Sequence, residues 1–165
     1  MLIPITAKII RPFIATLNFL TPLGDMLVRC WIAYIFFTSG LTKVQSWETT
    51  LQLFTYEYHV PLLTPELAAL LGTGAELILP LLLVLGLGGR FCILIFFIYN
   101  AIAAVSYPFL WTPEGSMGLQ QHVSWGLLLM LLMLHGSGKL SIDHWIHVRH
   151  RHHLLAKAKT PHVGQ

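Results

Sequence analysis

Charged residues are scarce in this chain: Asp, Glu, Lys and Arg make up only 10% of its 165 residues, against roughly 25% in ordinary soluble domains. Hydrophobic residues make up 55%, and the mean hydropathy is +0.69. The apolar runs approach the ~20 residues that are needed to cross a hydrocarbon core of about 30 Å. This composition argues against a soluble globular domain and predicts an integral membrane protein in contact with the lipid bilayer.

Cysteine is also scarce, because the chain has only two, Cys30 and Cys92. They are far apart in the sequence and form no Cys-x-x-Cys pair. Membrane-embedded thiol oxidoreductases need an exposed reactive pair of cysteines, so two isolated thiols argue against that class of enzyme. We interpret both residues as buried side chains that behave like small apolar groups.

Four apolar segments are long enough to span a membrane. A hydroxyl residue followed by proline, as in Thr21-Pro22 and Thr64-Pro65, is typical of a capped helix start and precedes the first two segments. Glycines between residues 86 and 89 predict a tight turn. We therefore predict an all-α membrane protein built as a four-transmembrane-helix bundle. The predicted spans are Asp25 to Val44, Glu66 to Leu87, Arg90 to Trp111 and Leu119 to Leu140.

The segment from Met1 to Leu20 is apolar but carries polar groups along one side. Lys8, Arg11, Ala15 and Asn18 recur at helical spacing and form one stripe. No small-x-small cleavage site follows, which argues against a cleaved signal peptide. We predict an N-terminal amphipathic helix that lies in the membrane interface. The chain then divides into this segment (1–20), the membrane domain (21–146) and a basic, histidine-rich tail (147–165).

Basic residues concentrate on one side of this four-span layout, and only Lys43 falls toward the other side. The positive-inside rule places the basic side, with both chain termini, in the cytoplasm. We predict a multi-pass protein of the bacterial inner (plasma) membrane. The net charge of +3 is then a signal of orientation and predicts no nucleic-acid partner. The basic residues on that side are Lys8, Arg11, Arg29, Arg90, Lys139, Arg149, Arg151, Lys157 and Lys159.

Two basic residues lie on one face of the first span. Arg29 and Lys43 share this face with Ala33, Phe36 and Gly40, at spacings of three and four residues. Ionisable groups in membrane spans almost always face the bundle interior or a wet cavity, so we predict that this face points inward. The alternative is that both charges snorkel to the headgroups at the two ends of the helix.

The second span carries a carboxyl group at its centre. Glu76 lies about ten residues, roughly 15 Å, from either end of the span. Pro80 has no N–H group, so the carbonyl of Glu76 loses its helical hydrogen bond. A carboxyl group and a free carbonyl therefore need partners near the centre of the bilayer.

Matching the depths of polar residues across the spans predicts a polar column. A direct salt bridge between Lys43 and Glu76 would have to cover about 10 Å of depth, so we expect a bridging water or polar group instead. Two interpretations stay open: a network that only fixes helix packing, or a site for a ligand, a proton or a cofactor of unknown kind. No catalytic residue is predicted. The predicted members are Lys43, Tyr107 and His122 in the outer half, Glu76 and Asn100 at the centre, and Arg29 on the cytoplasmic side.

The C-terminal run is DHWIHVRHRHHLL, with five histidines. The first three, His144, His147 and His150, recur every three residues and could bring imidazoles together around zinc or copper. Histidines beside arginines are also typical of a basic juxtamembrane tail. Asp143 is the only carboxylate in the run, so we interpret it as such a tail and predict no metal site.

A family resemblance is carried by LVRCWIAYIFFTSGLTKVQSW, GTGAELILPLLLVLGLGGR and HGSGKLSIDHW. These segments resemble the DoxX family of small four-helix membrane proteins, over about residues 22–146. YEYHVPLLTPELAALLGTGAEL and SYPFLWT are more closely similar to HvfX-type members of that family, which are associated with the maturation of copper-binding ribosomal peptides of the bufferin type. The resemblance implies that Arg29, Gly40, Lys43 and Glu76 are the functional candidates.

The resemblance implies two functions of different classes. The first is an accessory membrane protein without enzymatic turnover that supports maturation, export or handling of a copper-binding modified peptide. Its partner would be the peptide precursor or the maturation enzyme. The alternative is a quinone-linked oxidoreductase subunit that uses the polar column around Glu76, since the family name comes from a subunit associated with a quinol oxidase. Similarity of fold does not transfer activity, so we favour the first function and leave homo-oligomer formation open.

Overall fold

The computed structural model describes the backbone of residues 3–136, 138 and 140–159, and it describes side chains in this range except those of residues 3–7, 9 and 152–159. Lys139, one of the predicted orientation signals, therefore lies outside the described residues. The described part of the chain forms six α-helices and one short 3-10 helix. They are α1 (Ile3–Gln45), α2 (Trp47–Tyr56), α3 (Pro65–Leu85), α4 (Gly89–Ser106), η1 (Pro108–Trp111), α5 (Ser116–His135) and α6 (Ile142–Lys159).

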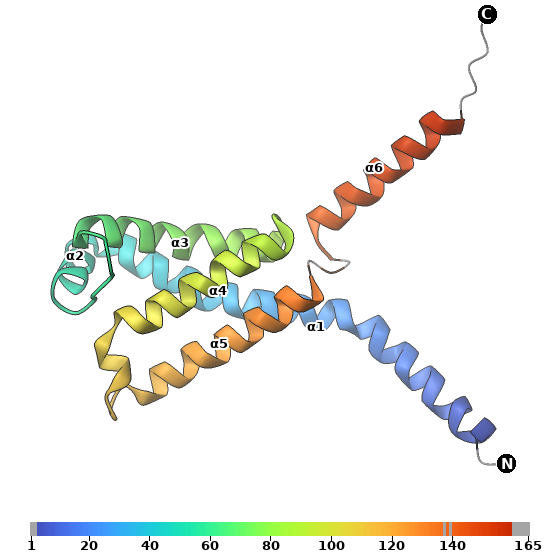
Figure 1. Cartoon of the computed structure of the whole chain (residues 1–165), viewed down its shortest axis with the longest axis horizontal. Helices are drawn as coiled ribbons and strands as arrows, with labels where there is room; N and C mark the ends of the chain where they lie inside the picture. Colours follow the sequence, from blue (N-terminus) through green and yellow to red (C-terminus); the bar gives the residue numbers. More distant parts are fainter. Residues whose placement is uncertain (1–2, 137, 139, 160–165) are drawn as a thin grey trace, which may run out of the picture.

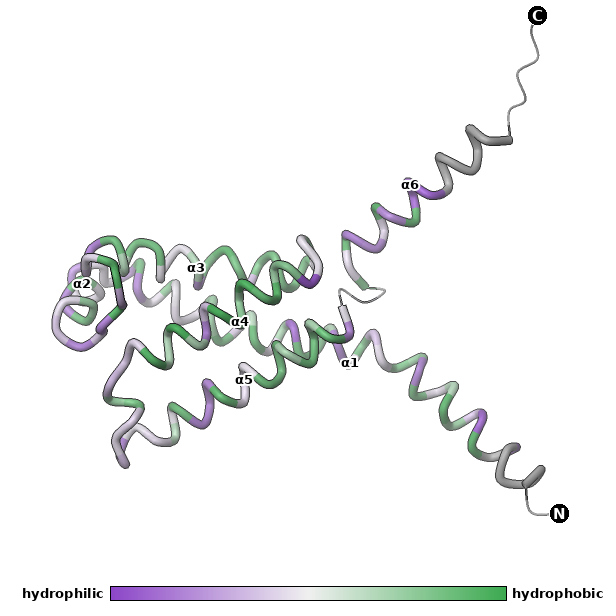
Figure 2. The backbone as a smooth tube through the Cα atoms, in the orientation of Figure 1, coloured by the Kyte–Doolittle hydropathy of each residue, from purple (hydrophilic) through white to green (hydrophobic). Residues whose placement is uncertain are grey.

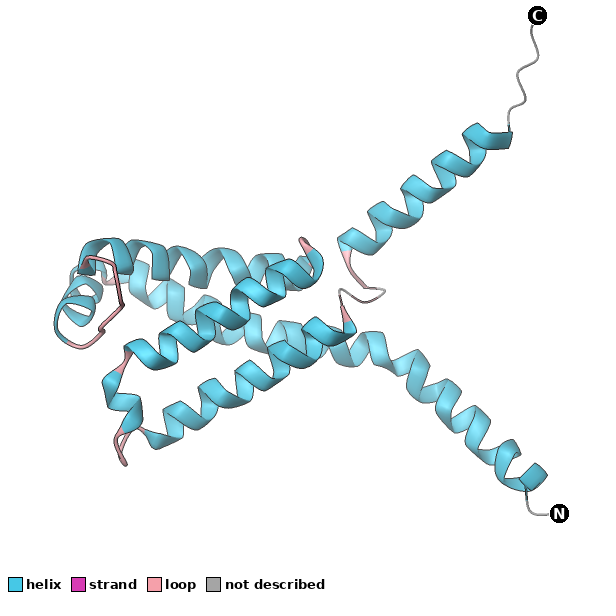
Figure 3. Cartoon of the chain, in the orientation of Figure 1, coloured by secondary structure: helices cyan, strands magenta, loops and turns pink. Residues whose placement is uncertain are grey.

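Four of these helices are long and apolar enough to cross a membrane: α1 from Ile10 onward, α3, α4 and α5. The second half of α1 lies beside α3, α4 and α5 in one bundle, which Figure 3 draws without strands in the described residues. Hydrophobic residues predominate along all four (Figure 2). The predicted all-α four-helix membrane fold is thus confirmed.

The core of the bundle lies at the level of Phe36, where all four helices meet. The Phe36 ring packs edge-on against Phe96 of α4, with 4.8 Å between ring centroids, and against Trp125 of α5 at 5.3 Å. Leu79 of α3 belongs to the same cluster of buried residues. Outward-facing apolar side chains such as Leu131 are exposed. This pattern is expected when lipid, in place of water, covers the outer surface of the helices.

The prediction of two buried thiols is wrong for one of them. Cys92 is buried among the core residues, whereas Cys30 is exposed. Cys30 follows Arg29, which is buried, and its side chain points about 100° away from that of Arg29, toward the outside of the bundle. An exposed thiol on an apolar span lies against lipid, where its low polarity is tolerated.

The first span does not begin at Thr21-Pro22 as predicted, because α1 runs unbroken from Ile3 to Gln45 with Pro12 and Pro22 inside it. The Thr21 hydroxyl donates to the Leu17 carbonyl at 3.0 Å and does not cap a helix start. Prolines are tolerated inside helices in apolar surroundings, where side chains such as this threonine satisfy local carbonyls and no water competes for them. The predicted N-terminal helix exists, but it continues directly into the first span.

The other predicted helix boundaries are close to those observed. The Thr64 hydroxyl accepts from Leu67 N at the start of α3, which confirms this N-cap. Gly86 and Gly88, with φ of +65° and +75°, form the predicted tight turn before α4. The third and fourth spans end earlier than predicted, at Ser106 and His135. Tyr107 is extended before Pro108, as residues preceding proline usually are, and Gly136 adopts a positive φ of +87°.

The two ends of the bundle differ in structure. The first part of α1 and α6 both leave from one end, where the turn between α3 and α4 also lies (Figure 1). α2 lies at the opposite end and buries Phe54 against Ala68 and Ala69 of α3. The Thr50 hydroxyl of α2 donates to the Lys43 carbonyl at 3.0 Å, so it caps the last turn of α1.

Candidate functional site

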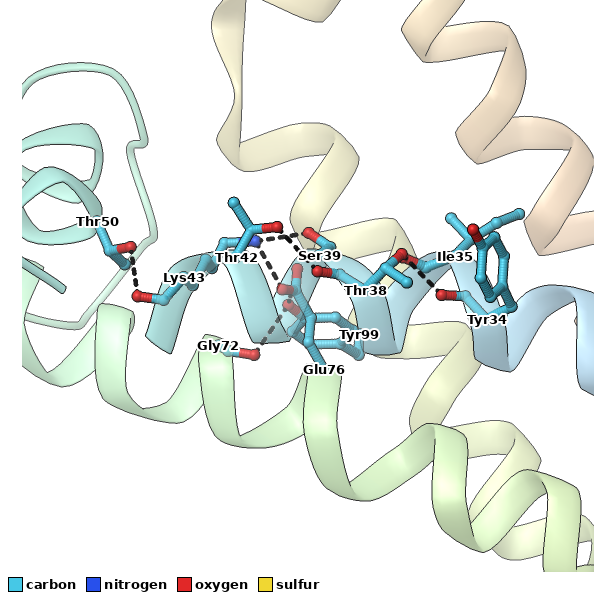
Figure 4. Close-up of polar contacts among 10 residues, drawn as sticks. All are labelled: Tyr34, Ile35, Thr38, Ser39, Thr42, Lys43, Thr50, Gly72, Glu76 and Tyr99. Atoms are coloured by element: carbon cyan, nitrogen blue, oxygen red, sulfur yellow. Dashed lines mark hydrogen bonds and ion pairs between the residues drawn. The ribbon is translucent and has the colours of Figure 1, made fainter. Parts of the chain in front are cut away.

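An ion pair joins α1 to α3 inside the bundle. Lys43 Nζ lies 2.6 Å from Glu76 Oε2, and the two side chains are only 13% and 8% exposed. The same ammonium group donates to Ser39 Oγ at 2.9 Å (Figure 4). The expectation of a bridging water or polar group between Lys43 and Glu76 is therefore wrong, because the two charges are in direct contact.

The error came from assuming that the spans end at equal depths. Gly40 lies opposite Glu76, since a Cβ atom added at Gly40 would be 3.0 Å from Glu76 Cβ. From this contact α1 continues for about 7.5 Å to Gln45, whereas α3 extends for about 16 Å to Pro65. α3 thus projects roughly 9 Å beyond α1. Lys43, about 4.5 Å beyond Gly40, is close enough for its long side chain to reach Glu76.

Tyr99 of α4 completes the site and was missed from the sequence. Its hydroxyl lies 3.0 Å from Glu76 Oε1 and 3.1 Å from the Gly72 carbonyl (Figure 4). Both carboxylate oxygens of Glu76 therefore have partners, one from α1 and one from α4. A phenol has a single proton, so Tyr99 donates to Glu76 or to Gly72 at any moment. Its position next to Asn100, which was predicted to lie level with Glu76, was the available signal.

Asn100 pairs with His122 of α5, on the other side of the Phe36 ring from Glu76. Its amide nitrogen donates to the His122 carbonyl at 2.9 Å, and its Oδ1 lies 2.9 Å from His122 Nδ1. Because the amide oxygen only accepts, we assign the imidazole proton to Nδ1, which leaves Nε2 as an acceptor. Gly126 permits this approach, since a Cβ atom there would lie 3.2 Å from the Asn100 nitrogen.

Arg29 lies near the other end of the bundle, about 21 Å along α1 from Lys43. It is only 2% exposed, so it does not snorkel to the headgroups. Its Nη2 donates to the Gly136 carbonyl at 3.4 Å, and Arg90 Nη2 donates to the Leu134 carbonyl at 3.2 Å. Both guanidinium groups thus bind the C-terminal end of α5, where carbonyls lack helical partners and cations are favoured.

Tyr107 does not join the ion pair, because α4 ends before it and the backbone turns away. Its hydroxyl donates to Glu57 Oε2 at 3.1 Å, and its ring packs on Tyr58 with 4.8 Å between centroids. Burial and then the hydrogen bond to Glu57 raise the pKa of Tyr107. Burial, followed by the charges of neighbouring groups, raises the pKa of Tyr58 to about 12. Both phenols therefore remain protonated at neutral pH.

A family model described as DoxX matches residues 24–108, just over half of the chain. The chain belongs to the DoxX family. The matched region of this DoxX protein contains Lys43, Glu76 and Tyr99, so the complete ion-pair site lies within it. His122 and α6 lie beyond the match. Among curated proteins and among solved structures, no significant match to the chain is found.

The predicted site residues of this DoxX protein thus fall into separate groups. Lys43 and Glu76 meet with Tyr99 added, Asn100 pairs with His122, and Arg29 and Tyr107 lie near opposite ends of the bundle. The ring of Phe36 lies between the first two groups, with its centroid 6.2 Å from that of Tyr99 and 6.4 Å from that of His122. The single column predicted from depth matching is therefore replaced by an ion-pair site and an adjacent histidine–asparagine pair.

The histidine tail of the DoxX protein is partly described. His144, His147 and His150 are exposed on α6, and His147 Nδ1 lies 3.0 Å from the Asp143 carbonyl. The side chains of His152 and His153 lie outside the described residues. Among the described side chains, no group of three or more His, Cys, Asp or Glu residues is placed to hold a metal ion.

The Glu76 carboxylate links three helices. It accepts from Lys43 of α1 and lies within hydrogen-bond distance of Tyr99 of α4. The Tyr99 hydroxyl also reaches the Gly72 carbonyl of α3. A change at this one carboxylate therefore alters the contacts among α1, α3 and α4 together.

Proposed function

We propose that this DoxX protein is an accessory membrane protein without enzymatic turnover, and that the Lys43–Glu76 pair is its functional centre. The observation that carries the proposal is the direct contact between a buried carboxylate and a largely buried ammonium group of two membrane spans. A buried ion pair gives little net stability, because removing both charges from water offsets most of their attraction. Ionisable groups inside spans are rare and usually mark functional sites.

Through this ion pair, binding of a partner could change how the helices of the bundle pack. Glu76 is held from both sides by Lys43 and Tyr99, on two different helices. A partner that competes for the Glu76 carboxylate would weaken both contacts at once. The packing of α1 and α4 against α3 would respond, which is the behaviour expected of a protein that signals binding across a bilayer.

The pathway that we propose is the maturation, export or handling of a copper-binding modified peptide. Its support is the similarity of two segments to HvfX-type members, together with their meeting in space. The His59 N–H group donates to the Ser106 carbonyl at 2.7 Å, and Tyr107 bonds to Glu57, a residue 50 positions away. The two segments thus form one surface, which we propose as the docking surface for the peptide precursor or the maturation enzyme.

We further propose that this surface faces the outside of the bacterial inner membrane, with both termini in the cytoplasm. The surface lies at the end of the bundle opposite to the first part of α1 and α6 (Figure 1). Basic residues gather at the latter end, in agreement with the positive-inside rule. An exported peptide would then meet the surface after leaving the cytoplasm.

A quinone-linked oxidoreductase subunit is the second candidate function. The observation that favours it is the aromatic group beside the ion pair, formed by Phe36, Tyr99, His122 and Trp125. Aromatic rings and an imidazole Nε2 acceptor suit a planar head group with hydroxyl or carbonyl oxygens. A stoichiometric quinone in the protein purified in mild detergent would support this candidate over the first.

The test of the proposed function neutralises both charges and keeps both side chains polar. Lys43→Gln with Glu76→Gln is introduced into a strain that lacks its own copy of the protein, and growth in copper is compared with wild type. We expect the double variant to reach the membrane at the wild-type level, measured by immunoblot, without restoring copper tolerance. Thr42→Val, a change at an exposed residue beside Lys43, is the matched control and should behave as wild type. Full restoration by the double variant would contradict the proposal and assign the pair to packing.

A further inference from the structure

α1 is much longer than a bilayer requires. Its 43 residues extend over about 65 Å, whereas ~20 residues suffice to span the hydrocarbon core. Only its second half packs in the bundle, and the first part leaves it at the same end as α6 (Figure 1). Every described side chain from Ile10 to Thr21 is exposed. The first part of α1 therefore has a large surface that the described residues of the chain do not cover.

This part of α1 is amphipathic. Ile10, Ile14 and Leu17, which are about half exposed, point to one side of the helix together with Phe13. Lys8 and Arg11 lie on the opposite side. A helix of this kind is most stable flat on a membrane, with its apolar side in the acyl chains and its basic side among the headgroups.

α6 has a similar arrangement at the same end of the bundle. It begins at Ile142, a few residues after α5 ends at His135, so it starts at the membrane surface. Ile142, Trp145 and Ile146 share one side and are exposed. The Arg149 guanidinium lies 5.2 Å from the centroid of the Trp145 ring. Tryptophan is enriched at the level of the lipid headgroups, and a stacked arginine there faces the phosphates.

Charge identifies what covers these two helices. Residues 3–24 and 142–159 contain six Lys or Arg residues and a single acid, Asp143. A second copy of the chain would bring the same positive charge to the contact and be repelled. A bilayer surface that carries anionic lipids instead attracts these two basic helices, by about 1 kcal/mol for each basic residue near the surface.

We propose that the first part of α1 (residues 3–24) and α6 are two arms that lie on the membrane surface and bind the headgroups of anionic phospholipids. The arms lie at the end of the bundle opposite to the proposed docking surface, so this binding does not depend on the proposed function. It would fix the depth and tilt of α1, whose other half carries Lys43.

The test measures amide hydrogen exchange in the full chain, reconstituted in nanodiscs of phosphatidylcholine alone or with added phosphatidylglycerol. We expect both arms to exchange about tenfold more slowly with the anionic lipid, and high salt should reverse most of this slowing. Lys8→Gln with Arg11→Gln should abolish the slowing in α1 only, and Arg149→Gln with Arg151→Gln in α6 only. Glu48→Gln, at the opposite end of the bundle, is the matched control and should change neither arm.

Two outcomes would overturn the proposal. Equal exchange of both arms in the two kinds of nanodisc would mean that the arms do not recognise anionic lipid. Slow exchange that depends on having two chains in one nanodisc, whatever the lipid, would mean that a second copy covers the arms.

Discussion

At the scale of single residues, the charges of Lys43 and Glu76 depend on each other. Glu76 is buried and Lys43 is only slightly exposed, and each has the other as its ionic partner at 2.6 Å. Removing one charge leaves the second buried without compensation, which is much less favourable than removing both. Variants at this site therefore have to be compared in pairs.

We predict that Glu76→Gln lowers the free energy of unfolding by about 3–5 kcal/mol, because Lys43 stays charged. Adding Lys43→Gln should recover most of this loss, although the double variant is expected to be inactive. The measurement is reversible unfolding of the purified protein by SDS in mixed micelles. A double variant that is as unstable as Glu76→Gln would contradict the ion-pair interpretation, because the loss of stability would then not come from an unpaired Lys43 charge.

Tyr99 should contribute to stability through the buried carboxylate. We predict that Tyr99→Phe lowers the free energy of unfolding by about 1.5–3 kcal/mol, as expected for loss of a hydrogen bond to a charged group. Tyr107→Phe is the matched control, because it removes a phenol that bonds to exposed Glu57. Its effect should stay below about 1 kcal/mol. Equal effects in the SDS titration would contradict the assignment of Tyr99 to the site.

The residues of the ion pair could be predicted from the sequence, but their contact could not. Charged residues in apolar helices are conspicuous, and helical spacing places Lys43 on the buried face of α1. The rotation of α4 about its axis is set by packing, which spacing within one helix does not reveal. Asn100 and Tyr99 are neighbours on α4, about 100° apart. The sequence-based prediction placed Asn100 beside Glu76, but Asn100 contacts α5.

At the scale of helices, the contact between α1 and α3 depends on the small size of Gly40. Its added Cβ atom would lie 3.0 Å from both Glu76 Cβ and a Leu77 methyl carbon. Such distances are shorter than ordinary van der Waals contact, so a larger residue would push the two helices apart. The Lys43–Glu76 pair lies next to this contact and would lengthen with it.

We predict that Gly40→Ala lowers the free energy of unfolding by about 1–3 kcal/mol, the range for overpacking. It should also reduce function. Gly74→Ala is the matched control on α3, because an added Cβ atom there meets nothing within 4 Å. It should be neutral or slightly stabilising, since alanine favours the helix more than glycine. Unfolding in SDS and copper tolerance are the two readouts, and equal behaviour of the variants would contradict a close contact at Gly40.

The Thr-Pro pattern predicted a helix start correctly where it is exposed in a loop, and incorrectly where it lies in an apolar segment. Thr64-Pro65 caps α3 as expected, at the end of an exposed loop. The same pattern at Thr21-Pro22 lies within α1, with the Thr21 hydroxyl bonded to the preceding turn. Rules for helix starts come mainly from helices that end in water, where unpaired backbone groups can bind water. In apolar surroundings those groups would stay unpaired, so the helix is more stable if it continues.

At the scale of the whole molecule, the four-helix fold could be predicted because hydrophobic length sets the number of spans. The relative depth of the spans could not. α3 begins well beyond the end of α1, and α2 packs in the space this difference leaves. This offset, in turn, brings Lys43 to Glu76. A two-dimensional layout treats every span as level and therefore places the site residues at the wrong heights.

The histidine tail should be dispensable for copper handling. We predict that removing residues 147–165 leaves copper tolerance largely intact, whereas Lys43→Gln with Glu76→Gln abolishes it. The proposed topology puts the tail in the cytoplasm, while an exported peptide would bind copper outside. Metal analysis of the detergent-purified protein checks this independently. One tightly bound copper per chain that disappears with the tail would show that the protein is itself a metal carrier.

The topology decides which end of the bundle a partner can reach. In the first part of α1 and α6, basic residues outnumber acids, whereas α2 and the loop that follows it contain Glu48 and Glu57 and no Lys or Arg. We predict that alkaline phosphatase fused after His59 or at Gly115 is active outside the membrane, whereas fusions at Gly88 and after Lys159 are inactive. Fluorescent protein fusions at the same positions should give the complementary result. An active phosphatase at Gly88 would place the turn between α3 and α4 outside. The proposed docking surface would then face the cytoplasm, where an exported peptide could not dock on it.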